Sequence, residues 1–497
     1  MRPARSASPT VTGVLEGYQP ALVALVAAFA ALIVGYRMRG FFPDDALITL
    51  RFARNLERGD GWTYNVGTNT ANGATSPAYT AAIALLSIPM RTATHAADLL
   101  FVTSLAAIAG FLTAIFKRAD ALWVGAAAAV LVLACAGLLD TKGLESLPFL
   151  AIVCAVLWAY ARERDVALGA FCALLVLVRG EGALLVLVIL AQAGVVRKRP
   201  PVKAMVTGAL VGLPWVVYSL VTFGSVLPDT LEAKVAQGQS GYWGHGRIFL
   251  RGFFDLADPL GYRTWLYVVA PLAVAGLVRG LADRRLRRIV APLVIATALH
   301  TMAYGLVFNV PAYYWYYAWE LFTLALLAAI AVDWFLDRLT TAARGSAPRI
   351  AIALLAGTVV AASRSPVYTR ATNAHYVAMG EWLASNTPSN ARIAATEIGT
   401  IGWVSDRPIV DYLGLLDTTS IAEVRRVDFV SWLERTEPDY WVVHSPRWDF
   451  EVALDQPWFT VAYHPVYVTD LIAGEYRLIV YQRVTSIATA RAAVSSG

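Results

Sequence analysis

Two adjacent carboxylates, Asp44 and Asp45, follow a proline in the stretch "RGFFPDDALITLRFARNL" (39–56). They come just after a long apolar run. A carboxylate pair beside a membrane can act as general base on a hydroxyl group, or it can hold a divalent cation against phosphate oxygens. Adjacent carboxylates also disfavour double ionisation, which raises one pKa toward the range of a base. On this stretch alone, acidic residues that only start a helix are the favoured interpretation.

Further charged side chains occur in stretches expected on the same side of the membrane. Glu145 begins a helix in "DTKGLESLPF" (140–149), and "LVRGEG" contains Arg179 and Glu181. Charges at membrane depth are energetically costly and are usually functional or paired. The structural alternatives are an acid in a first helical turn for Glu145 and a mutual ion pair for the other two.

A long polar stretch, residues 223–247, carries Lys234, His245 and Arg247. Lysine and arginine side chains in such a loop can bind a phosphate or pyrophosphate group. The alternative is a solvated loop with no ligand.

Aromatic residues are dense in "NVPAYYWYYAWE" (309–320), which includes Tyr313 and Trp315. They predict either an aromatic belt at the membrane interface or stacking against a sugar ring or a polyprenyl chain. No Ser-His-Asp order, P-loop, GxGxxG motif or His/Cys metal spacing is present, and each of the three cysteines lies in an apolar run.

The amino-acid composition indicates the class of protein that positions these residues. Of 497 residues, 58% are apolar and 15% are charged, against about 25% charged in soluble domains. The mean hydropathy is +0.56. The net charge of +6 comes from basic residues in short loops such as 197–203 and 279–288, a pattern typical of cytoplasmic loops. Nucleic acid is excluded as a partner because no folded basic domain accompanies these clusters.

Twelve apolar runs are candidate membrane-spanning helices. They lie near residues 21–36, 78–90, 98–116, 121–139, 147–160, 167–178, 183–196, 204–222, 264–279, 289–308, 317–336 and 349–362. The positive-inside rule places the loops 40–76, 140–146, 223–262 and 309–316 outside the cytoplasm. It also places the C-terminal tail outside, which requires eleven crossings, so we predict that the short run 78–90 enters the membrane without crossing it.

The composition changes after residue 363. The stretches 392–417, 439–445 and 476–484 predict β-strands, and 376–387 predicts a helix. This alternation predicts a small extracytoplasmic α/β domain over residues 363–497, following a transmembrane domain over 1–362 whose first outer loop is 40–76. The last dozen residues are small and polar, and we predict a disordered end.

The order of these pieces resembles the GT-C superfamily of glycosyltransferases, which are multi-span enzymes with a carboxylate motif in the first outer loop. Within it, the sequence is most similar to the group containing the terminal arabinofuranosyltransferases of the mycobacterial cell wall. Two residues depart from the expected pattern: Gly180 stands where a proline is expected, and Asp229 where an asparagine is expected. The stretches that carry the resemblance are 44–67, "GLES" (143–146), "RGEG" (179–182), "FGSVLPDTLEAK" (223–234) and 397–417.

The resemblance implies an α-helical polytopic membrane protein of GT-C type in a bacterial plasma membrane, with about eleven transmembrane helices, a C-terminal α/β domain and an extracytoplasmic active site. The enzyme would move a sugar from a polyprenyl-phosphate donor in the lipid to a cell-envelope glycan acceptor by inverting displacement. Arabinofuranose is the first choice of sugar, and mannose or another hexose is the alternative. A lipid monophosphate donor needs no nucleotide-binding domain. No cofactor is assigned, and a divalent cation stays an alternative.

The resemblance also implies roles for the candidate residues. One of Asp44 and Asp45 would be the base, and Asp44 is favoured. The donor phosphate would be bound by Lys234, His245 and Arg247. The substrate would be bound by Glu145, Arg179, Glu181, Tyr313 and Trp315.

Two other classes of function remain as alternatives. A transporter or flippase for lipid-linked sugars would show paired broken helices and inverted repeats, whereas this chain shows one broken run and no repeat. A structural subunit with a decayed site is disfavoured by the intact Asp44–Asp45 pair.

Overall fold

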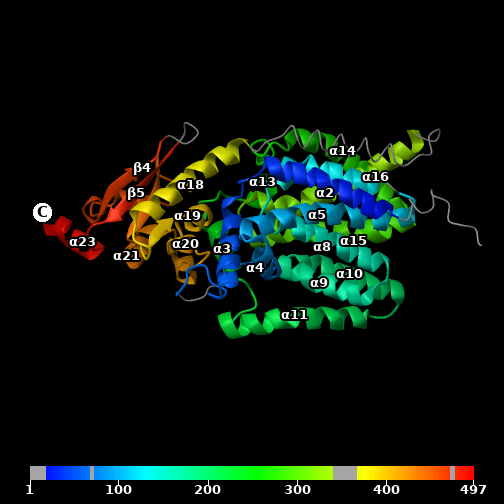
Figure 1. Cartoon of the computed structure of the whole chain (residues 1–497), viewed down its shortest axis with the longest axis horizontal. Helices are drawn as coiled ribbons and strands as arrows, with labels where there is room; N and C mark the ends of the chain where they lie inside the picture. The colour runs from blue at the N-terminus through cyan, green and yellow to red at the C-terminus, as the bar shows by residue number, and fades with distance from the viewer. Residues whose placement is uncertain (1–17, 68–71, 122, 340–366, 471–475, 497) are drawn as a thin grey trace, which may run out of the picture.

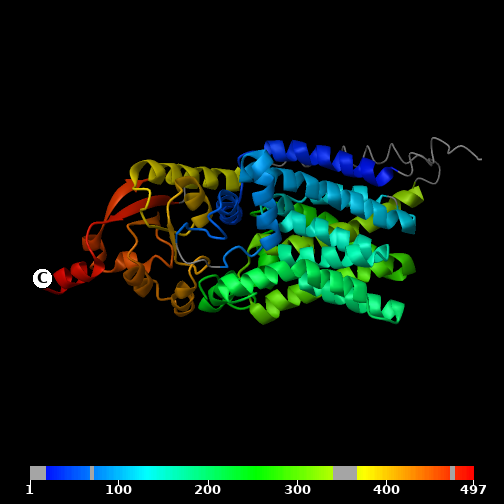
Figure 2. The same ribbon diagram turned by 60° about the horizontal axis from the view of Figure 1, so that its bottom comes forward.

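The computed structural model describes residues 18–67, 72–121, 123–339, 367–470 and 476–496. A bundle of long helices forms one part of the molecule, and a smaller domain with a β-sheet sits at one end of it (Figure 1). Turning the molecule shows the same two parts, with the C-terminus at the tip of the smaller domain (Figure 2).

Most helices of the bundle are apolar and share one alanine- and leucine-rich core. The bounds of its main helices are α2 Gln19–Arg37, α3 Asp44–Arg58, α4 Pro77–Met90, α5 Ala93–Phe116, α6 Val124–Leu133, α7 Ala136–Leu139, α8 Ser146–Ala161, α9 Asp165–Val178, α10 Gly182–Arg197, α11 Val202–Phe223, α12 Asp229–Ser240, α13 Ile248–Asp255, α14 Arg263–Ala282, α15 Arg284–Met302 and α16 Ala318–Leu339. A π-helical segment, Ala303–Phe308, extends α15, and a 3₁₀ turn, Tyr314–Tyr317, precedes α16.

Six described helical segments are long and apolar enough to cross a membrane: 19–37, 93–119, 202–223, 263–282, 284–308 and 314–338. Five shorter apolar helices, α4, α6, α8, α9 and α10, accompany them. The chain is therefore a multi-pass membrane protein, as predicted. The predicted run 121–139 is interrupted at Cys135, between α6 and α7. The run 349–362 lies outside the described residues, and the number of eleven crossings stays a prediction.

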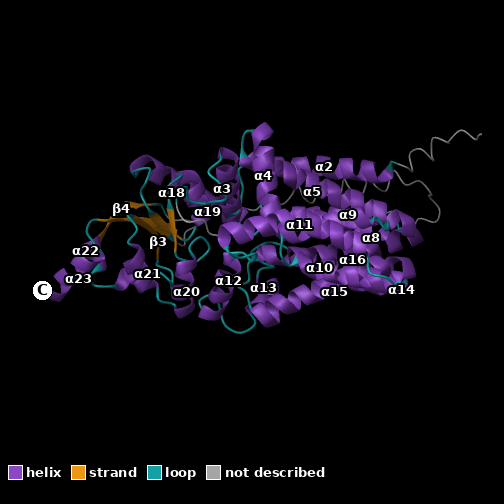
Figure 3. Ribbon diagram, turned by 90° about the horizontal axis from the view of Figure 1, so that it is seen from below, coloured by secondary structure: helices purple, strands orange, loops and turns teal. Residues whose placement is uncertain are grey.

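The short helix α4 differs in direction from its neighbours. It runs across the end of the bundle, whereas α2, α5 and α9 run along it (Figure 3). That residues 78–90 enter the membrane without crossing it stays a prediction.

The C-terminal domain contains a five-stranded sheet of order β2-β1-β3-β5-β4. β1 (Ile393–Ala395) is parallel to β2 (Ile409–Asp411) and β3 (Tyr440–Ser445), and β5 (Arg477–Arg483) is antiparallel to β3 and β4 (Tyr463–Val468). Its helices are α18 Val367–Asn386, α19 Ile398–Ser405, α20 Ile421–Arg426, α21 Phe429–Thr436, α22 Phe459–Ala462 and α23 Ile487–Ser496. The predicted α/β domain is confirmed, and the proposed boundary at 362/363 lies outside the described residues.

One strand of this domain was missed, and one prediction for it was wrong. The sequence did not indicate β4, because this strand lies at the sheet edge and contains Pro465, a residue that weakens a strand signal. The predicted disordered end is instead the helix α23, whose Ile487 and Ala490 are buried.

Candidate active site

A cavity of about 380 Å³ lies where the bundle meets the C-terminal domain. Its walls come from α3, the segment before α4, the start of α10, α12, and the aromatic segment before α16. The C-terminal domain adds Leu415. The polar and charged residues that line it are Asp45, Thr49, Thr75, Ser76, Glu145, Arg179, Glu181, Thr230, Lys234, Tyr304, Trp315 and Tyr316.

Asp45 is the member of the acidic pair that faces this cavity. The helix α3 begins at Asp44, directly after Pro43, and both carboxylates lie in the first turn of this helix. Enclosure by the surrounding protein raises the pKa of Asp45, and the positive charge of Lys234 lowers it in part. A half-buried carboxylate with a raised pKa is a suitable proton acceptor at neutral pH.

Asp44 points to the C-terminal domain instead. Its carboxylate accepts hydrogen bonds from the backbone N–H groups of Gly399 at 3.0 Å and Thr400 at 2.6 Å, at the start of α19. Burial raises its pKa to about 7, with a further upward contribution from Asp45. Asp44 does not line the cavity, so the preference for it as the base has no support in the geometry.

Two glycines allow α19 to approach α3 this closely. A Cβ atom at Gly399 would overlap the backbone carbonyl of Asp44, and one at Gly402 would overlap the Tyr64 hydroxyl and lie 2.8 Å from the Arg51 guanidinium. The motif "EIGTIGW" (397–403) therefore serves to dock one domain on the other.

The arginines of α3 belong to the same contact. The periodicity of α3 predicts an amphipathic helix at the membrane interface, with its arginines on a polar side. Arg51 is instead buried and donates to the carbonyl oxygens of Tyr64 (3.0 Å), Gly402 (2.5 Å) and Arg407 (2.9 Å). Arg54 pairs with Asp406 at 2.6 Å. The polar side of α3 therefore contacts protein at Arg51 and Arg54, while the Arg58 side chain is half exposed.

Lys142 is a positioning residue that the sequence did not single out. Its side chain is fully buried, and Nζ donates to the carbonyl oxygens of Met38 and Phe41, both at 3.1 Å. It also pairs with Asp98 at 2.8 Å. These bonds fix the loop that leads into the acidic pair. The signal was a lysine three residues before Glu145 in a short polar break between apolar runs.

Arg179 and Glu181 form the ion pair that the structural alternative predicts, and Glu145 joins them in one cluster. The backbone leaves the helix at Arg179, between α9 and α10. Its Nε lies 2.5 Å from Glu181 Oε1, and its Nη1 lies 3.5 Å from Glu145 Oε1. All three residues line the cavity. The two carboxylates neutralise this guanidinium, which leaves it less suited to bind a phosphate by itself.

Lys234 is better placed for an anion. Its Nζ lies 3.8 Å from the centre of the Tyr313 ring. Among the described residues it forms no ion pair within 4.0 Å. Tyr313 donates a hydrogen bond to Gln237 at 3.1 Å and stacks on Trp315 with ring centres 4.8 Å apart. Trp315 lines the cavity, whereas Tyr313 supports Lys234 from behind it.

His245 and Arg247 are exposed on the surface and do not line the cavity. The structure thus brings together Asp45, Lys234, Glu145, Arg179, Glu181 and Trp315, and leaves out these two predicted phosphate ligands.

Asp229, which stands where the resemblance predicts an asparagine, has a structural role. Its carboxylate accepts a hydrogen bond from the Asn72 backbone N–H at 2.8 Å, and its own N–H donates to the Asn72 carbonyl at 3.2 Å. These bonds join α12 to the segment that carries Gly73 and Thr75 into the cavity wall.

A second, apolar cavity of about 640 Å³ adjoins the first. It runs between α9, α10 and α11 and is lined by side chains such as Val176, Leu190 and Met205. Both cavities share the lining residues Thr75, Gly180, Ala183, Leu227 and Pro228. A chamber that contains the charged residues thus borders an apolar groove between three helices of the bundle.

In the part of the chain that the structure describes, no three His, Cys, Asp or Glu side chains gather as metal ligands would. The carboxylates around the cavity have cationic neighbours, Arg179 and Lys234. The role of a divalent cation stays a prediction.

Comparison with solved structures identifies the fold. The chain superposes on ArnT from Cupriavidus metallidurans bound to undecaprenyl phosphate with a TM-score of 0.62 and 15% identity, covering 96% of this chain and 99% of ArnT. The apo structure of the same protein gives a TM-score of 0.60 and 14% identity, with coverages of 94% and 98%. The predicted GT-C fold class is confirmed.

Comparison at the level of sequence adds one family. Residues 366–494 match a family described as a domain of unknown function (DUF8728). No curated protein matches the chain.

Proposed function

We propose that the protein is a membrane glycosyltransferase that transfers a sugar from a polyprenyl-phosphate donor to a hydroxyl group of a cell-envelope glycan. One observation carries the proposal: a chamber with a carboxylate and a lysine borders an apolar groove and shares five lining residues with it. An amphiphilic donor with a polar head and a long apolar chain has this shape. The ArnT structure with undecaprenyl phosphate supports the same class of donor for this fold.

The donor would lie across the junction of the two cavities. Its polyprenyl chain would occupy the groove between α9, α10 and α11, and its phosphate would lie near Lys234. The sugar would extend toward Asp45. Ser76 and Thr230 line the chamber, and their hydroxyl groups have no hydrogen-bond partner among the described residues. Such groups are suited to bind a polyhydroxy ligand.

The proposed reaction is a single displacement. Asp45 takes the proton of the acceptor hydroxyl, and that oxygen forms a bond to the anomeric carbon of the donor sugar. The bond between this carbon and the phosphate oxygen breaks, and polyprenyl phosphate leaves with the electron pair. Lys234 stabilises the negative charge that develops on the leaving phosphate. Attack from the opposite side inverts the anomeric centre.

Glu145, Arg179 and Glu181 would bind the sugar or the acceptor, with Trp315 offering an aromatic face for stacking. Within this class, arabinofuranose is the first choice of sugar from the sequence resemblance, and mannose or another hexose is the alternative. The site would open on the extracytoplasmic side of a bacterial plasma membrane. The C-terminal domain would help to bind the glycan acceptor, because it already contributes Leu415 to the chamber.

The test uses membranes that contain the full-length protein, supplied with radiolabelled polyprenyl-phosphate arabinofuranose or mannose and a cell-envelope fraction. Transfer of label to the glycan is expected with one of the two donors. The Asp45→Asn variant should lose transfer by about 10²–10⁴-fold, the typical contribution of a general base. Asp60→Asn, which removes an exposed carboxylate just beyond α3, is the matched control.

The proposal fails if Asp45→Asn transfers label at the wild-type rate. It also fails if the labelled lipid changes leaflet without any transfer to glycan, the result expected of a flippase.

A further inference from the structure

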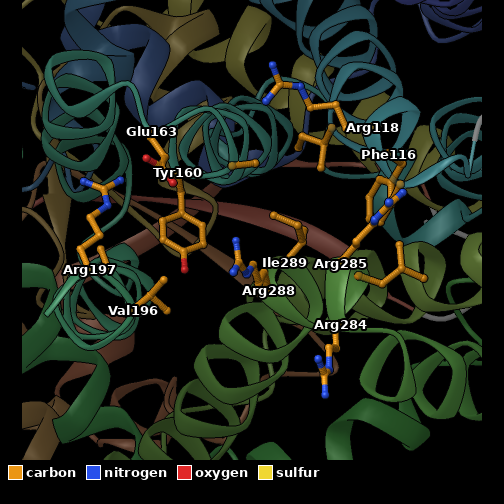
Figure 4. Close-up of a pocket in the computed structure, with 15 residues that line it drawn as sticks. Phe116, Arg118, Tyr160, Glu163, Val196, Arg197, Arg284, Arg285, Arg288 and Ile289 are labelled. Atoms are coloured by element: carbon orange, nitrogen blue, oxygen red, sulfur yellow. The ribbon is translucent and has the colours of Figure 1, made fainter.

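A third cavity, of about 370 Å³, lies apart from the candidate active site. Its walls come from the end of α5, the ends of α8 and α10, and the start of α15 (Figure 4). Five arginines line it against a single glutamate, Glu163, and the buried side chain of Tyr160 forms part of the wall. These arginines are Arg118, Arg197, Arg284, Arg285 and Arg288.

This basic pocket lies at the opposite end of the bundle from the candidate active site. Glu181, in the active-site chamber, directly precedes α10, and Arg197, in the basic pocket, ends it. The 16 residues of α10 separate the two sites by about 24 Å at the rise of an α-helix. Glu145 and Tyr160 stand in the same relation at the two ends of α8. A ligand of the basic pocket therefore approaches from the other side of the membrane.

The positive charge of the pocket is only partly neutralised by the protein. Arg197 pairs with Asp165 at 2.5 Å, and Arg285 pairs with the exposed Asp120 at 3.2 Å. In the described ranges of the chain, the side chains of Arg118, Arg284 and Arg288 form no ion pair within 4.0 Å.

The position of these charges on α15 is itself unfavourable. Four arginines, Arg284, Arg285, Arg287 and Arg288, lie in the first turns of this helix, and its first turn contains no acidic residue. Cations at a helix N-terminus oppose the helix dipole, and like charges repel one another. Asp283 caps the helix by accepting from the N–H groups of Arg285 and Leu286, but it does not balance the charge. An anion in the pocket would relieve both effects.

We propose that this pocket is a phosphate-binding site for the head group of an anionic phospholipid. Arginine side chains from three separate helix ends supply the donors that a phosphodiester group accepts. The pocket also has apolar walls, formed by residues such as Phe116, Val196 and Ile289, against which the glycerol and first methylene groups can pack. Basic pockets between helix ends at a membrane surface are suited to such lipids.

The experiment measures lipid binding to the purified full-length protein in detergent by native mass spectrometry. Phosphatidylglycerol and phosphatidylcholine with the same acyl chains are titrated separately, and inorganic phosphate is added as a competitor. The double variant Arg284→Gln/Arg288→Gln should bind phosphatidylglycerol about thirtyfold more weakly than wild type, the loss expected from two cationic contacts at a lipid surface.

The matched control removes the same charge nearby. Lys198 and Arg287 are exposed, lie near the same helix ends, and do not line the pocket. Lys198→Gln/Arg287→Gln should retain phosphatidylglycerol binding within about twofold of wild type. That change in affinity is smaller than the loss expected from removing one cationic contact. Equal loss in both double variants would show a diffuse charge effect and overturn the pocket. Equal binding of the two lipids would overturn it as well.

Inorganic phosphate distinguishes the source of the anion. Binding of phosphatidylglycerol that persists in excess inorganic phosphate supports a lipid site. Complete displacement by inorganic phosphate would overturn the lipid head group as the ligand.

Discussion

The Asp44 carboxylate accepts a hydrogen bond from the backbone N–H of Gly399 at 3.0 Å, although the two residues are 355 positions apart in the chain. Together with the bond from Thr400, this contact ties the first turn of α3 to the first turn of α19. The carboxylate pair is thereby divided: one member holds the C-terminal domain, and the other faces the cavity. The position of Asp45 depends on a domain that follows the bundle in sequence.

The first prediction concerns this contact. Gly399→Ala should destabilise the docking of α19 on α3, because the added Cβ would overlap the Asp44 carbonyl. Overpacking of this kind costs about 1–3 kcal/mol, so the C-terminal domain should become sensitive to limited proteolysis at a lower temperature, and sugar transfer should fall with it. Gly35→Ala is the control, since a Cβ there makes only ordinary contacts with the Phe101 ring, at 3.8 Å, and Gly35 lines neither cavity of the site. An unchanged proteolysis profile in Gly399→Ala would contradict the docking role.

Much of the fold could be predicted from the sequence because it depends on local patterns. Apolar runs predict the helices of the bundle, and the alternation of helix and strand signals after residue 363 predicts the α/β domain. The edge strand β4 was missed because its proline and exposed residues conceal it from such patterns.

The candidate site was predictable only in part, because it depends on how distant segments meet. The carboxylate pair, Lys234 and the Arg179–Glu181 cluster were found from their types and locations. The division of labour between Asp44 and Asp45 could not be found, since it follows from the approach of α19. Arg51 lies on the polar side of α3, and its burial depends on carbonyl oxygens of the docked domain. The path of the loop determines whether His245 and Arg247 reach the cavity, and the sequence does not reveal that path. In the structure the loop leaves both residues exposed.

The second prediction separates Lys234 from those two residues. Lys234→Gln should reduce sugar transfer by about 10²–10³-fold, since it removes a preorganised charge that stabilises the leaving phosphate. His245→Gln and Arg247→Gln should transfer sugar at nearly the wild-type rate, because their side chains are exposed outside the chamber. Initial rates of sugar transfer, measured in membranes over a range of donor concentrations, compare the three variants with the wild-type protein. A large loss in the Arg247→Gln variant together with a mild one in Lys234→Gln would reverse this assignment.

The third prediction is the pH dependence of transfer. A general base must be ionised, and burial raises the pKa of Asp45 above the ordinary value of 3.8. Transfer should therefore decline, as the pH is lowered, at a higher pH than an ordinary aspartate would give. Lys234 lowers this pKa, so the residual activity of Lys234→Gln should begin its decline at a higher pH still. A profile of kcat/KM against pH for both proteins checks the sign, and a shift of the variant to lower pH would contradict it.

The fourth prediction concerns Gly180, which lines both the chamber that contains Asp45 and the apolar groove beside it. A Cβ at this position meets nothing within 4 Å, so a side chain can start here without a clash, and we expect that of Gly180→Leu to enter the junction. The KM for the polyprenyl-phosphate donor should rise by about tenfold, a loss of about 1.4 kcal/mol in binding, while the melting temperature stays unchanged. Gly180→Ala, with a single methyl group, should have a smaller effect.

A donor with a truncated prenyl chain sharpens this fourth test. If the chain of the natural donor passes through the junction, the wild-type protein and Gly180→Leu should differ much less with a donor too short to reach the groove. An equal rise in KM for both donors would instead indicate that the leucine obstructs the sugar or phosphate within the chamber. A rise in KM only for the long donor would make this junction a determinant of which lipid donors the protein accepts.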